Sequence, residues 1–255
     1  MAIIDAHVHI PSSSGENFGW PTATTLGEVL GKMDAAGIAK AVITSARSTQ
    51  AKDMWEARAG NREMLEAVAQ HPNRFIGACQ VHPSSPRDAV EELRIMREEC
   101  GIHWLGELCG YLGGYAYDTR EFEMILGAAS DLGMIVQIHT TDLATLTKQA
   151  KAHPSTPFIL CHMGGAKEYS ARVAAVKDHP NLYIDISGSD ISRAGILEAY
   201  ICEAGPEKVL FATDYIICEP VVYVARVETL DISAEAKEQI FHRNVERLLA
   251  DSGRA

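Results

Sequence analysis

Eight short apolar runs recur along the 255 residues of the chain, and a longer helical pattern follows each of them. Strands that alternate with helices in this way form a parallel sheet, because each helix carries the chain back to the end at which the next strand begins. Eight such units are typical of a closed barrel rather than an open sheet. The sequence therefore predicts an α/β fold, a single-domain (β/α)8 TIM barrel that spans residues 1–255.

The spacing of the apolar runs supports this prediction. Each unit takes about 23–33 residues, the length of a strand, a helix and two short loops. The strands are expected at residues 3–9, 41–44, 75–81, 102–105, 134–138, 158–161, 182–186 and 209–212. Helices are expected at 25–36, 48–70, 86–100, 119–132, 142–152, 166–177 and 193–203, with short helices at 221–228, 234–241 and 245–250.

The composition excludes several classes of protein. Hydrophobic residues make up 47% of the chain and charged residues 22%, as in ordinary soluble globular proteins. The formal charge of −11, with no basic run, argues against a nucleic-acid surface. No apolar stretch approaches the ~20 residues of a membrane span, and the start of the chain lacks the basic region of a signal peptide. We therefore expect no membrane association, and a homo-oligomer is compatible with the sequence.

The cysteines are scattered and include no Cys-x-x-Cys pair. Such spacing favours reduced thiols that mostly pack in the core of a cytoplasmic protein. They are Cys79, Cys100, Cys109, Cys161, Cys202 and Cys218.

The first expected strand contains a His-x-His pair, His7 and His9. Side chains alternate between the two faces of a strand, so both imidazoles point the same way, about 7 Å apart. Two nitrogens at that separation can reach one ion, because zinc and similar metals bind imidazole at ~2.0–2.1 Å. On its own the pair is equally compatible with a solvated strand edge or a hydrogen-bonded core pair.

Further potential ligands follow the later apolar runs. In a barrel the carboxyl ends of the strands meet on one face, where active sites lie. The sequence thus supplies four imidazoles and two carboxylates to one small volume, which favours a metal centre over six incidental polar residues. The predicted metal ligands are His7, His9, Glu107, His139, His162 and Asp214.

These residues and their surroundings resemble a known family. The His-x-His pair, His139, His162 within the segment Cys-His-Met-Gly-Gly and Asp214 within Phe-Ala-Thr-Asp-Tyr are similar to the amidohydrolase superfamily. Residues 184–188 (Ile-Asp-Ile-Ser-Gly) and 243–249 (Arg-Asn-Val-Glu-Arg-Leu-Leu) resemble its amidohydrolase-related (type 2) branch. The resemblance covers nearly the whole chain, but its motifs are poorly specific for substrate.

The resemblance implies a role for each predicted ligand. His7, His9 and Asp214 would hold the more buried metal, and His139 and His162 a second one. Glu107 would bridge them, in the place where other members carry a carboxylated lysine and where TatD-like and some lactonase members carry glutamate. Members with one metal often lack such a bridge. The cofactor is thus one or two divalent metals per chain, with zinc preferred and manganese, iron, cobalt or nickel as alternatives.

The expected function is that of a metal-dependent hydrolase of a small organic ester, lactone, amide or phosphoester. A metal lowers the pKa of its water to ~7 and polarises the scissile bond. Asp214 would act as the general base and later as the acid. The first alternative is a metal-dependent decarboxylase (a lyase), which related branches contain and which Glu107 disfavours. A TatD-like nuclease, disfavoured by the acidic charge, and a catalytically silent metal-binding barrel are further alternatives.

Three residues are candidate substrate contacts. Arg47 follows the second strand and could clamp a carboxylate or phosphate, although a solvated loop arginine is slightly favoured. His82 ends the third strand, where a substrate contact and a loop-stabilising role are equally compatible with its position. Tyr111 lies in a Gly- and Tyr-rich loop after Glu107, which is either a mobile lid or a packed surface loop.

Overall fold

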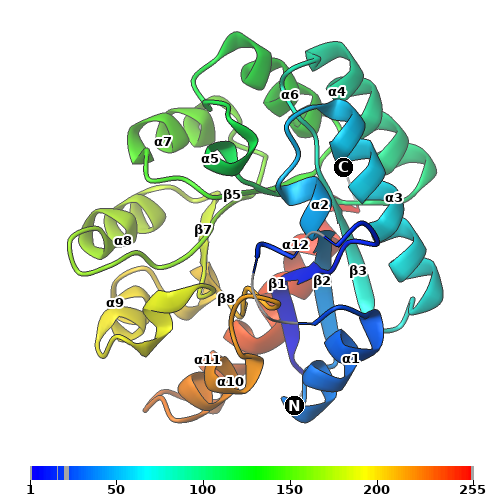
Figure 1. Ribbon diagram of the computed structural model, residues 1–255. Helices are drawn as coiled ribbons and strands as arrows, with labels where there is room; N and C mark the ends of the chain where they lie inside the picture. Colours follow the sequence, from blue (N-terminus) through cyan, green and yellow to red (C-terminus); the bar gives the residue numbers. More distant parts are fainter. Residues whose placement is uncertain (1, 16, 20–22, 254–255) are drawn as a thin grey trace.

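Eight parallel strands follow one another around a barrel, and helices cover its outside (Figure 1). The computed structural model describes residues 2–15, 17–19 and 23–253. The strand order β1 to β8 is the sequence order, so the predicted (β/α)8 TIM barrel is confirmed. The strands are β1 (Ile4–Ile10), β2 (Lys40–Ser45), β3 (Phe75–Cys79), β4 (Trp104–Leu108), β5 (Ile135–Ile138), β6 (Phe158–Leu160), β7 (Leu182–Asp185) and β8 (Val209–Leu210).

The barrel is closed by contacts between β1 and the segment that follows β8. Val8 forms a parallel bridge with Tyr215, and the backbone N–H of Asp214 donates to the carbonyl of His7 at 2.9 Å. A buried carboxylate, Asp5, adds to this closure by accepting from the backbone N–H of Thr213 at 3.0 Å and from its hydroxyl at 2.6 Å. Residues more than two hundred positions apart in the sequence therefore share one hydrogen-bonded edge.

Helices connect successive strands on the outside of the barrel. The helices are α1 (Leu26–Ala35), α2 (Ala46–Thr49), α3 (Met54–Gln70), α4 (Pro86–Arg94), α5 (Gly110–Gly113), α6 (Arg120–Asp131), α7 (Leu143–Ala152), α8 (Tyr169–Asp178), α9 (Ile196–Glu203), α10 (Pro220–Glu228), α11 (Ala234–Glu238) and α12 (Asn244–Ser252). Single π-helical turns follow α4 (η1, Ile95–Glu99) and α11 (η4, Gln239–Arg243), and short 3-10 turns precede α9 (η2, Ser189–Ser192) and β8 (η3, Pro206–Lys208). Among the described residues, no helix combines the length and hydropathy that a membrane-crossing segment needs.

Local capping explains where several helices begin. Thr25, the expected N-cap of the first helix, accepts from the backbone N–H of Glu28, whose carboxylate accepts from the N–H of Thr25 in return. This capping box satisfies two donors that the first turn leaves unpaired.

The single helix expected at 48–70 is wrong, because the chain forms α2 and α3 instead. Asp53 accepts from the backbone N–H of Glu56 at 3.0 Å and so caps a new helix inside the expected one. The Gly- and Tyr-rich loop also contains a short helix, α5, which the sequence pattern did not predict.

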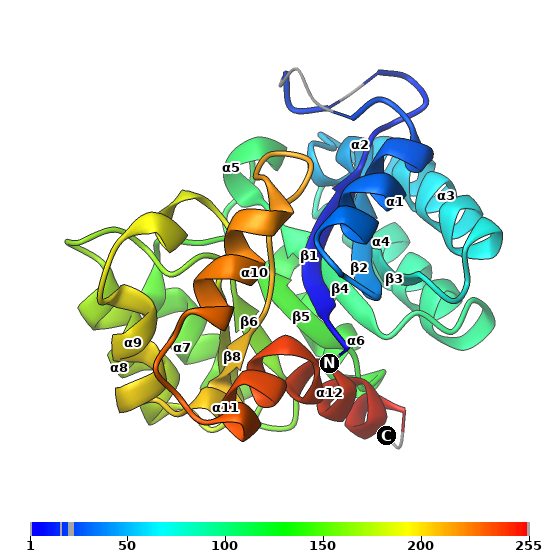
Figure 2. The same cartoon turned by 90° about the horizontal axis from the view of Figure 1, so that it is seen from below.

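Apolar side chains fill the barrel interior at the end opposite the site. Apolar side chains of alternate strand positions pack with Val245 and Leu248 of α12, among them Ile4, Val42, Trp104, Ile135 and Leu210. Figure 2 shows α12 across the end of the barrel at which the strands begin, whereas α2 and α5 lie at the opposite end. The strands therefore deliver their final residues to a face that α12 leaves uncovered.

Candidate metal centre

The six predicted ligands come together on the face where the strands end. His7 and His9 belong to β1 and Glu107 to β4, while His139, His162 and Asp214 lie just beyond β5, β6 and β8. Their nitrogen and oxygen atoms form two groups whose members all lie within 4.8 Å of one another. We call His7, His9 and Asp214 the first ligand group, and His139 with His162 the second ligand group.

The first ligand group is deeply buried. The Nε2 atoms of His7 and His9 lie 3.2 Å apart. Oδ1 of Asp214 lies 3.2 Å from Nε2 of His9 and 3.6 Å from Nε2 of His7. Three electron-pair donors, two from β1 and one from the segment after β8, thus face one point.

The second ligand group lies beside the first and closer to solvent. Nδ1 of His139 lies 3.1 Å from Nε2 of His162. The side chain of His139 is 25% exposed, compared with 2% for His7. A molecule that enters from the open face therefore meets the second ligand group first.

Glu107 divides its two oxygens between the groups. Oε1 lies 2.8 Å from Nδ1 of His139 and 3.5 Å from Nε2 of His162. Oε2 lies 3.3 Å from Nε2 of His7 and 3.5 Å from Nε2 of His9. One carboxylate is therefore placed to serve both groups.

The donor set fits a divalent metal. Oδ1 of Asp214 is buried and makes no hydrogen bond with any residue that the structure describes, although it faces two imidazole nitrogens. Ligand atoms around a tetrahedral ion bound at ~2.0–2.1 Å lie about 3.3 Å apart, which is close to the separations seen here. An ion would give the unpaired carboxylate oxygen and the facing nitrogens a common partner.

A register irregularity and two unusual backbone conformations set the directions of three predicted ligand side chains. The pairing of β4 with β5 shifts between Leu105 and Leu108, so Glu107 lies at a bulge within β4 rather than just after a strand, as the sequence predicted. Bulges of this kind redirect a side chain. His162 and Asp214 have φ of 64° and 65°, in the left-handed region that non-glycine residues rarely adopt. Such strain is common at functional sites, where the surrounding structure holds it in place.

The ring nitrogens that point away from the ligand cluster have partners of their own. Nδ1 of His9 lies 2.9 Å from the Thr44 hydroxyl on β2, and Nδ1 of His7 lies 3.1 Å from Oδ2 of Asp185 on β7. These contacts orient the rings, as outer partners of metal-binding histidines usually do. The sequence reading did not include Thr44 or Asp185 among the site residues.

Asp185 is a fully buried carboxylate with several donors. Oδ1 accepts from the backbone N–H groups of His162 at 3.0 Å and Ser187 at 3.1 Å. Oδ2 accepts from the Gln137 amide at 2.8 Å, and Gln137 is held in turn by the Trp104 indole at 2.9 Å. Burial opposes the charge, but His7 and the other donors outweigh it and hold the pKa of Asp185 below its usual range. The Asp-x-Ser alternation at the end of the seventh strand was the sequence signal for this residue.

Charges within the cluster perturb one another strongly. Burial opposes a positive charge on His7, but the Glu107 and Asp185 carboxylates outweigh it and raise the pKa of His7 well above its usual value. Burial likewise opposes the charge on Glu107, whereas His7, His139 and His162 hold the pKa of Glu107 well below its usual value. Protons and a divalent ion would therefore compete for the same atoms.

The three candidate substrate contacts lie in different settings. The ring of Tyr111 on α5 packs edge-on against His139, 4.9 Å between centroids, and the side chain is largely exposed beside the centre. His82 is buried, with Nε2 at 3.2 Å from the carbonyl of Gly113 and Nδ1 accepting from the N–H of Ser84, which favours its loop-stabilising role. The guanidinium of Arg47 stacks over an exposed ring, that of Trp55, at 5.0 Å. A role in substrate binding stays a prediction for all three.

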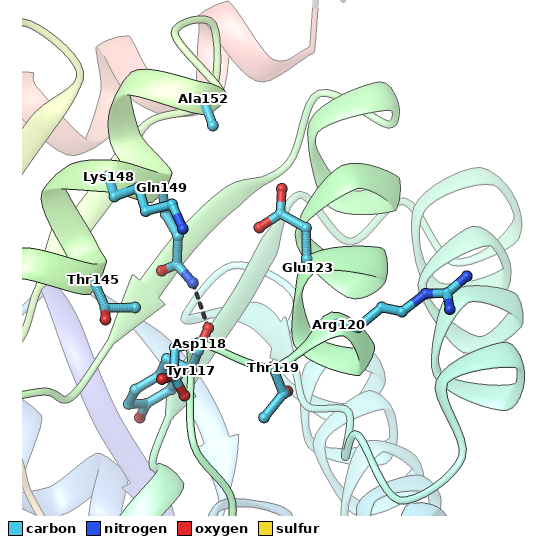
Figure 3. Close-up of a pocket in the computed structure, with 9 residues that line it drawn as sticks. All are labelled: Tyr117, Asp118, Thr119, Arg120, Glu123, Thr145, Lys148, Gln149 and Ala152. Carbon is cyan, nitrogen blue, oxygen red and sulfur yellow. Dashed lines mark hydrogen bonds between the residues drawn. The ribbon is translucent and has the colours of Figure 1, made fainter.

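A groove of about 370 Å³ lies on the outside of the barrel between α6 and α7 (Figure 3). The Gln149 amide donates there to the carbonyl of Tyr117 at 2.6 Å. The hydroxyl of Tyr117 reaches back toward the site and lies 2.8 Å from the carbonyls of both Leu108 and His139. None of the lining residues is a predicted ligand, and the contacts of Gln149 and Tyr117 tie the loop after β4 to α7.

Solved structures with the same barrel include enzymes of known activity. 2,6-Dihydroxybenzoate decarboxylase from Rhizobium is 20% identical, with a TM-score of 0.79 over 98% of this chain and 98% of that one. 5-Carboxyvanillate decarboxylase from Novosphingobium aromaticivorans, complexed with manganese and 4-hydroxy-3-methoxy-5-nitrobenzoic acid, is 18% identical, with a TM-score of 0.79 over 98% and 96% of the chains. An uncharacterised TIM-barrel protein from Bordetella bronchiseptica is 20% identical, with a TM-score of 0.81 over the whole of both chains. At sequence identities this low, the structural similarity shows a shared fold and no more.

Comparison at the level of families is more specific. No curated protein matches the sequence. The family model described as amidohydrolase matches residues 4–250, a range that includes all six predicted ligands. Because this match extends over nearly the whole sequence, the chain belongs to the amidohydrolase family.

Proposed function

We propose that the chain is a metal-dependent hydrolase that holds two divalent ions and cleaves a small organic ester, lactone, amide or phosphoester. The observation that carries this proposal is the position of Glu107, whose two oxygens face different ligand groups. A carboxylate shared in this way is suited to a pair of ions, and paired ions are common in hydrolytic centres.

The residues would divide between the ions as the geometry suggests. His7, His9 and Asp214 would hold one ion, His139 and His162 the other, and Glu107 both. A divalent ion, when bound, supplies Lewis-acid polarisation of the substrate and lowers the pKa of water. Zinc suits a donor set rich in imidazole, whereas the decarboxylase from Novosphingobium contains manganese. Both Zn²⁺ and Mn²⁺ should therefore be included in any test of metal binding or activity.

Asp214 is the proposed general base and acid. One oxygen, Oδ1, faces His7 and His9, and the side chain is about a tenth exposed, so its carboxylate borders both the ligand cluster and the open face. A carboxylate in this position can accept a proton from the attacking water and pass it to the leaving group. Tyr111, beside His139, would contact the substrate.

A metal-dependent decarboxylase is the second candidate, and the comparisons favour it more directly than they favour hydrolysis. The activities named for the similar solved structures described above are decarboxylations of hydroxylated benzoates. Such a reaction would use an ion to hold the substrate carboxylate. The presence of Glu107 between two ligand groups is the observation that favours hydrolysis instead. A nuclease, a catalytically silent barrel, a homo-oligomer and a cytoplasmic location stay predictions.

The two candidates predict different behaviour for Glu107→Ala. Wild-type protein loaded with Mn²⁺ or Zn²⁺ would be assayed against panels of esters, lactones, amides and phosphoesters, and against hydroxybenzoates with CO2 release as the signal. If the chain is a two-metal hydrolase, Glu107→Ala loses one metal equivalent and its hydrolytic turnover together. Decarboxylation that persists in a one-metal Glu107→Ala protein would instead establish the second candidate.

Replacement of the proposed base gives an independent check. Asp214→Asn keeps the shape and one metal-binding oxygen but removes the basic carboxylate. We expect kcat to fall by about 10²–10⁴-fold while bound metal is largely retained. The role of Asp214 is wrong if metal content and more than about a tenth of wild-type kcat both survive. Metal content would be measured by elemental analysis of the same samples.

A further inference from the structure

The hydroxyl of Ser187 contacts one histidine from each ligand group. Oγ lies 3.1 Å from Nδ1 of His7 and 2.8 Å from Nδ1 of His162. Ser187 is fully buried and lies two residues beyond Asp185, the last residue of β7. No part of the proposed hydrolytic reaction assigns this residue a role.

The direction of each hydrogen bond follows from what the groups can donate. The hydroxyl of Ser187 donates to Oδ1 of Asp185, which as a carboxylate oxygen can only accept. Once its proton is used there, Oγ has only its lone pairs to offer to the two imidazoles. Nδ1 of His162 and Nδ1 of His7 must then carry the hydrogens in those contacts.

The tautomers set in this way suit the ligand cluster. A neutral imidazole has one protonated and one free nitrogen. With hydrogens on Nδ1, both rings present an unprotonated Nε2, and these are the atoms that lie within 3.5 Å of Glu107. Ser187 therefore determines which nitrogen is free on His162. At His7 it shares this role with Asp185, whose Oδ2 lies 3.1 Å from the same Nδ1 and can only accept.

We propose that Ser187 is a positioning residue that fixes His162, and together with Asp185 also His7, in the Nδ1–H tautomer, so that one hydroxyl supports both metal positions. The consequence for metal affinity rests on the proposed function, whereas the tautomers themselves do not. Asp185 acts in the same arrangement, because Oδ1 accepts the hydrogen bond of the Ser187 hydroxyl and Oδ2 accepts from Nδ1 of His7.

Thr44 provides a matched control. Its hydroxyl makes a similar contact, at 2.9 Å, but only with Nδ1 of His9 in the first ligand group. Loss of that hydroxyl in Thr44→Val is nearly isosteric and removes an outer partner from one group only. Ser187→Ala removes an outer partner from both.

Metal titration of the folded proteins tests the consequence. Wild type, Ser187→Ala and Thr44→Val would be titrated with Mn²⁺, with circular dichroism as the check on folding. Outer partners of metal-binding histidines are typically worth about 10–100-fold in affinity. We expect Ser187→Ala to weaken both binding constants by such a factor, and Thr44→Val to weaken only one. A Ser187→Ala protein in which either constant is unchanged would contradict the shared role.

The tautomers can be observed without metal or substrate. Histidine ¹⁵N shifts of metal-free wild-type protein, recorded at a pH at which the rings are neutral, report which ring nitrogen carries hydrogen. We expect Nδ1–H at His7 and His162, and a mixture at His162 in Ser187→Ala. An Nε2–H signal at His162 in the wild type would overturn the proposal. A wild-type protein that binds no metal but shows both Nδ1–H tautomers would contradict the proposed function alone.

Discussion

Each buried histidine of the first ligand group is held at the nitrogen opposite its ligand atom. His7 is fixed through Asp185 and Ser187, and His9 through Thr44. A ring held on one side keeps its free nitrogen in place before any ion arrives, which lowers the entropy lost on binding. At the scale of single residues, the site is therefore organised by the groups behind the ligands as much as by the ligands.

The raised pKa values in this cluster predict that metal binding depends on pH. Burial opposes protonation of His9, but the neighbouring Asp214 and Glu107 carboxylates outweigh it and raise its pKa, as Glu107 and Asp214 do for the partly buried His162. A raised pKa means that these rings keep their protons to higher pH than a free imidazole does, so an ion must displace protons over that range. Affinity should therefore fall as pH falls, with protons released on binding.

Calorimetric titration with Zn²⁺ or Mn²⁺ in two buffers of different ionisation enthalpy measures those protons. The number released should decrease as the pH rises through the raised histidine pKa values. A binding enthalpy that is the same in both buffers at neutral pH would show that the ligands are already unprotonated. Metal-free protein in the same buffers serves as the control for dilution and for changes in folding.

At the scale of elements, the segment after β7 is shaped around His162. Gly188 has φ of 78°, and a Cβ atom added there would lie 2.6 Å from Nδ1 of His162. That is closer than any ordinary contact, so a side chain at this position would force the imidazole to move. The glycine therefore meets two demands, a left-handed backbone and close approach to a ligand.

Gly188→Ala should weaken metal binding, and Gly195→Ala is its control. Gly195 has φ of 88° but nothing within 4 Å of an added Cβ. Gly195→Ala should lose about 1–2 kcal/mol of unfolding free energy from its left-handed backbone. Gly188→Ala should lose about 1–3 kcal/mol, because φ of 78° with ψ of 179° is a region essentially confined to glycine. Only Gly188→Ala should also lose the metal held by the second ligand group. Denaturant unfolding and elemental analysis measure the two effects, and equal metal loss in both variants would exclude the contact with His162 as its cause.

The convergence of the six predicted ligands could be predicted from the sequence, because a barrel places the ends of all its strands on one face. A polar residue after an apolar run was therefore enough to place His139, His162 and Asp214 in one cluster; that they bind metal stays a prediction. The partners Thr44 and Ser187 could not be predicted in this way, because their contacts depend on how β2 and β7 pack beside histidines of other strands. The bulge at Glu107 also depends on pairing with β5, which no local pattern records.

At the scale of the whole molecule, α12 stabilises the barrel from the end opposite the site. Leu248 is buried among side chains of the barrel interior, together with Val245. The family match includes this helix, since it extends to residue 250. Stability and chemistry are thus placed at opposite ends of the strands, as is usual for this fold.

Leu248→Ala should destabilise the protein without changing the metal stoichiometry of the folded fraction. Truncation of a buried leucine typically costs about 2–5 kcal/mol, because the cavity left behind is only partly filled. Glu246→Ala on the same helix is the control, since the Glu246 side chain is 54% exposed and pairs with His242 at the surface. Thermal unfolding and elemental analysis would be compared. Altered metal stoichiometry in folded Leu248→Ala would show that the two ends of the barrel are coupled.

The closure of the barrel between β1 and the segment after β8 also has a consequence for biosynthesis. His7 and His9 leave the ribosome early, but Asp214, which completes their group, is made only after more than two hundred residues have been translated. A nascent chain can therefore present an incomplete set of ligands for most of its synthesis. Secure capture of an ion by the first ligand group must wait until the ends of the barrel have joined. Metal uptake at that position would consequently report that folding is finished.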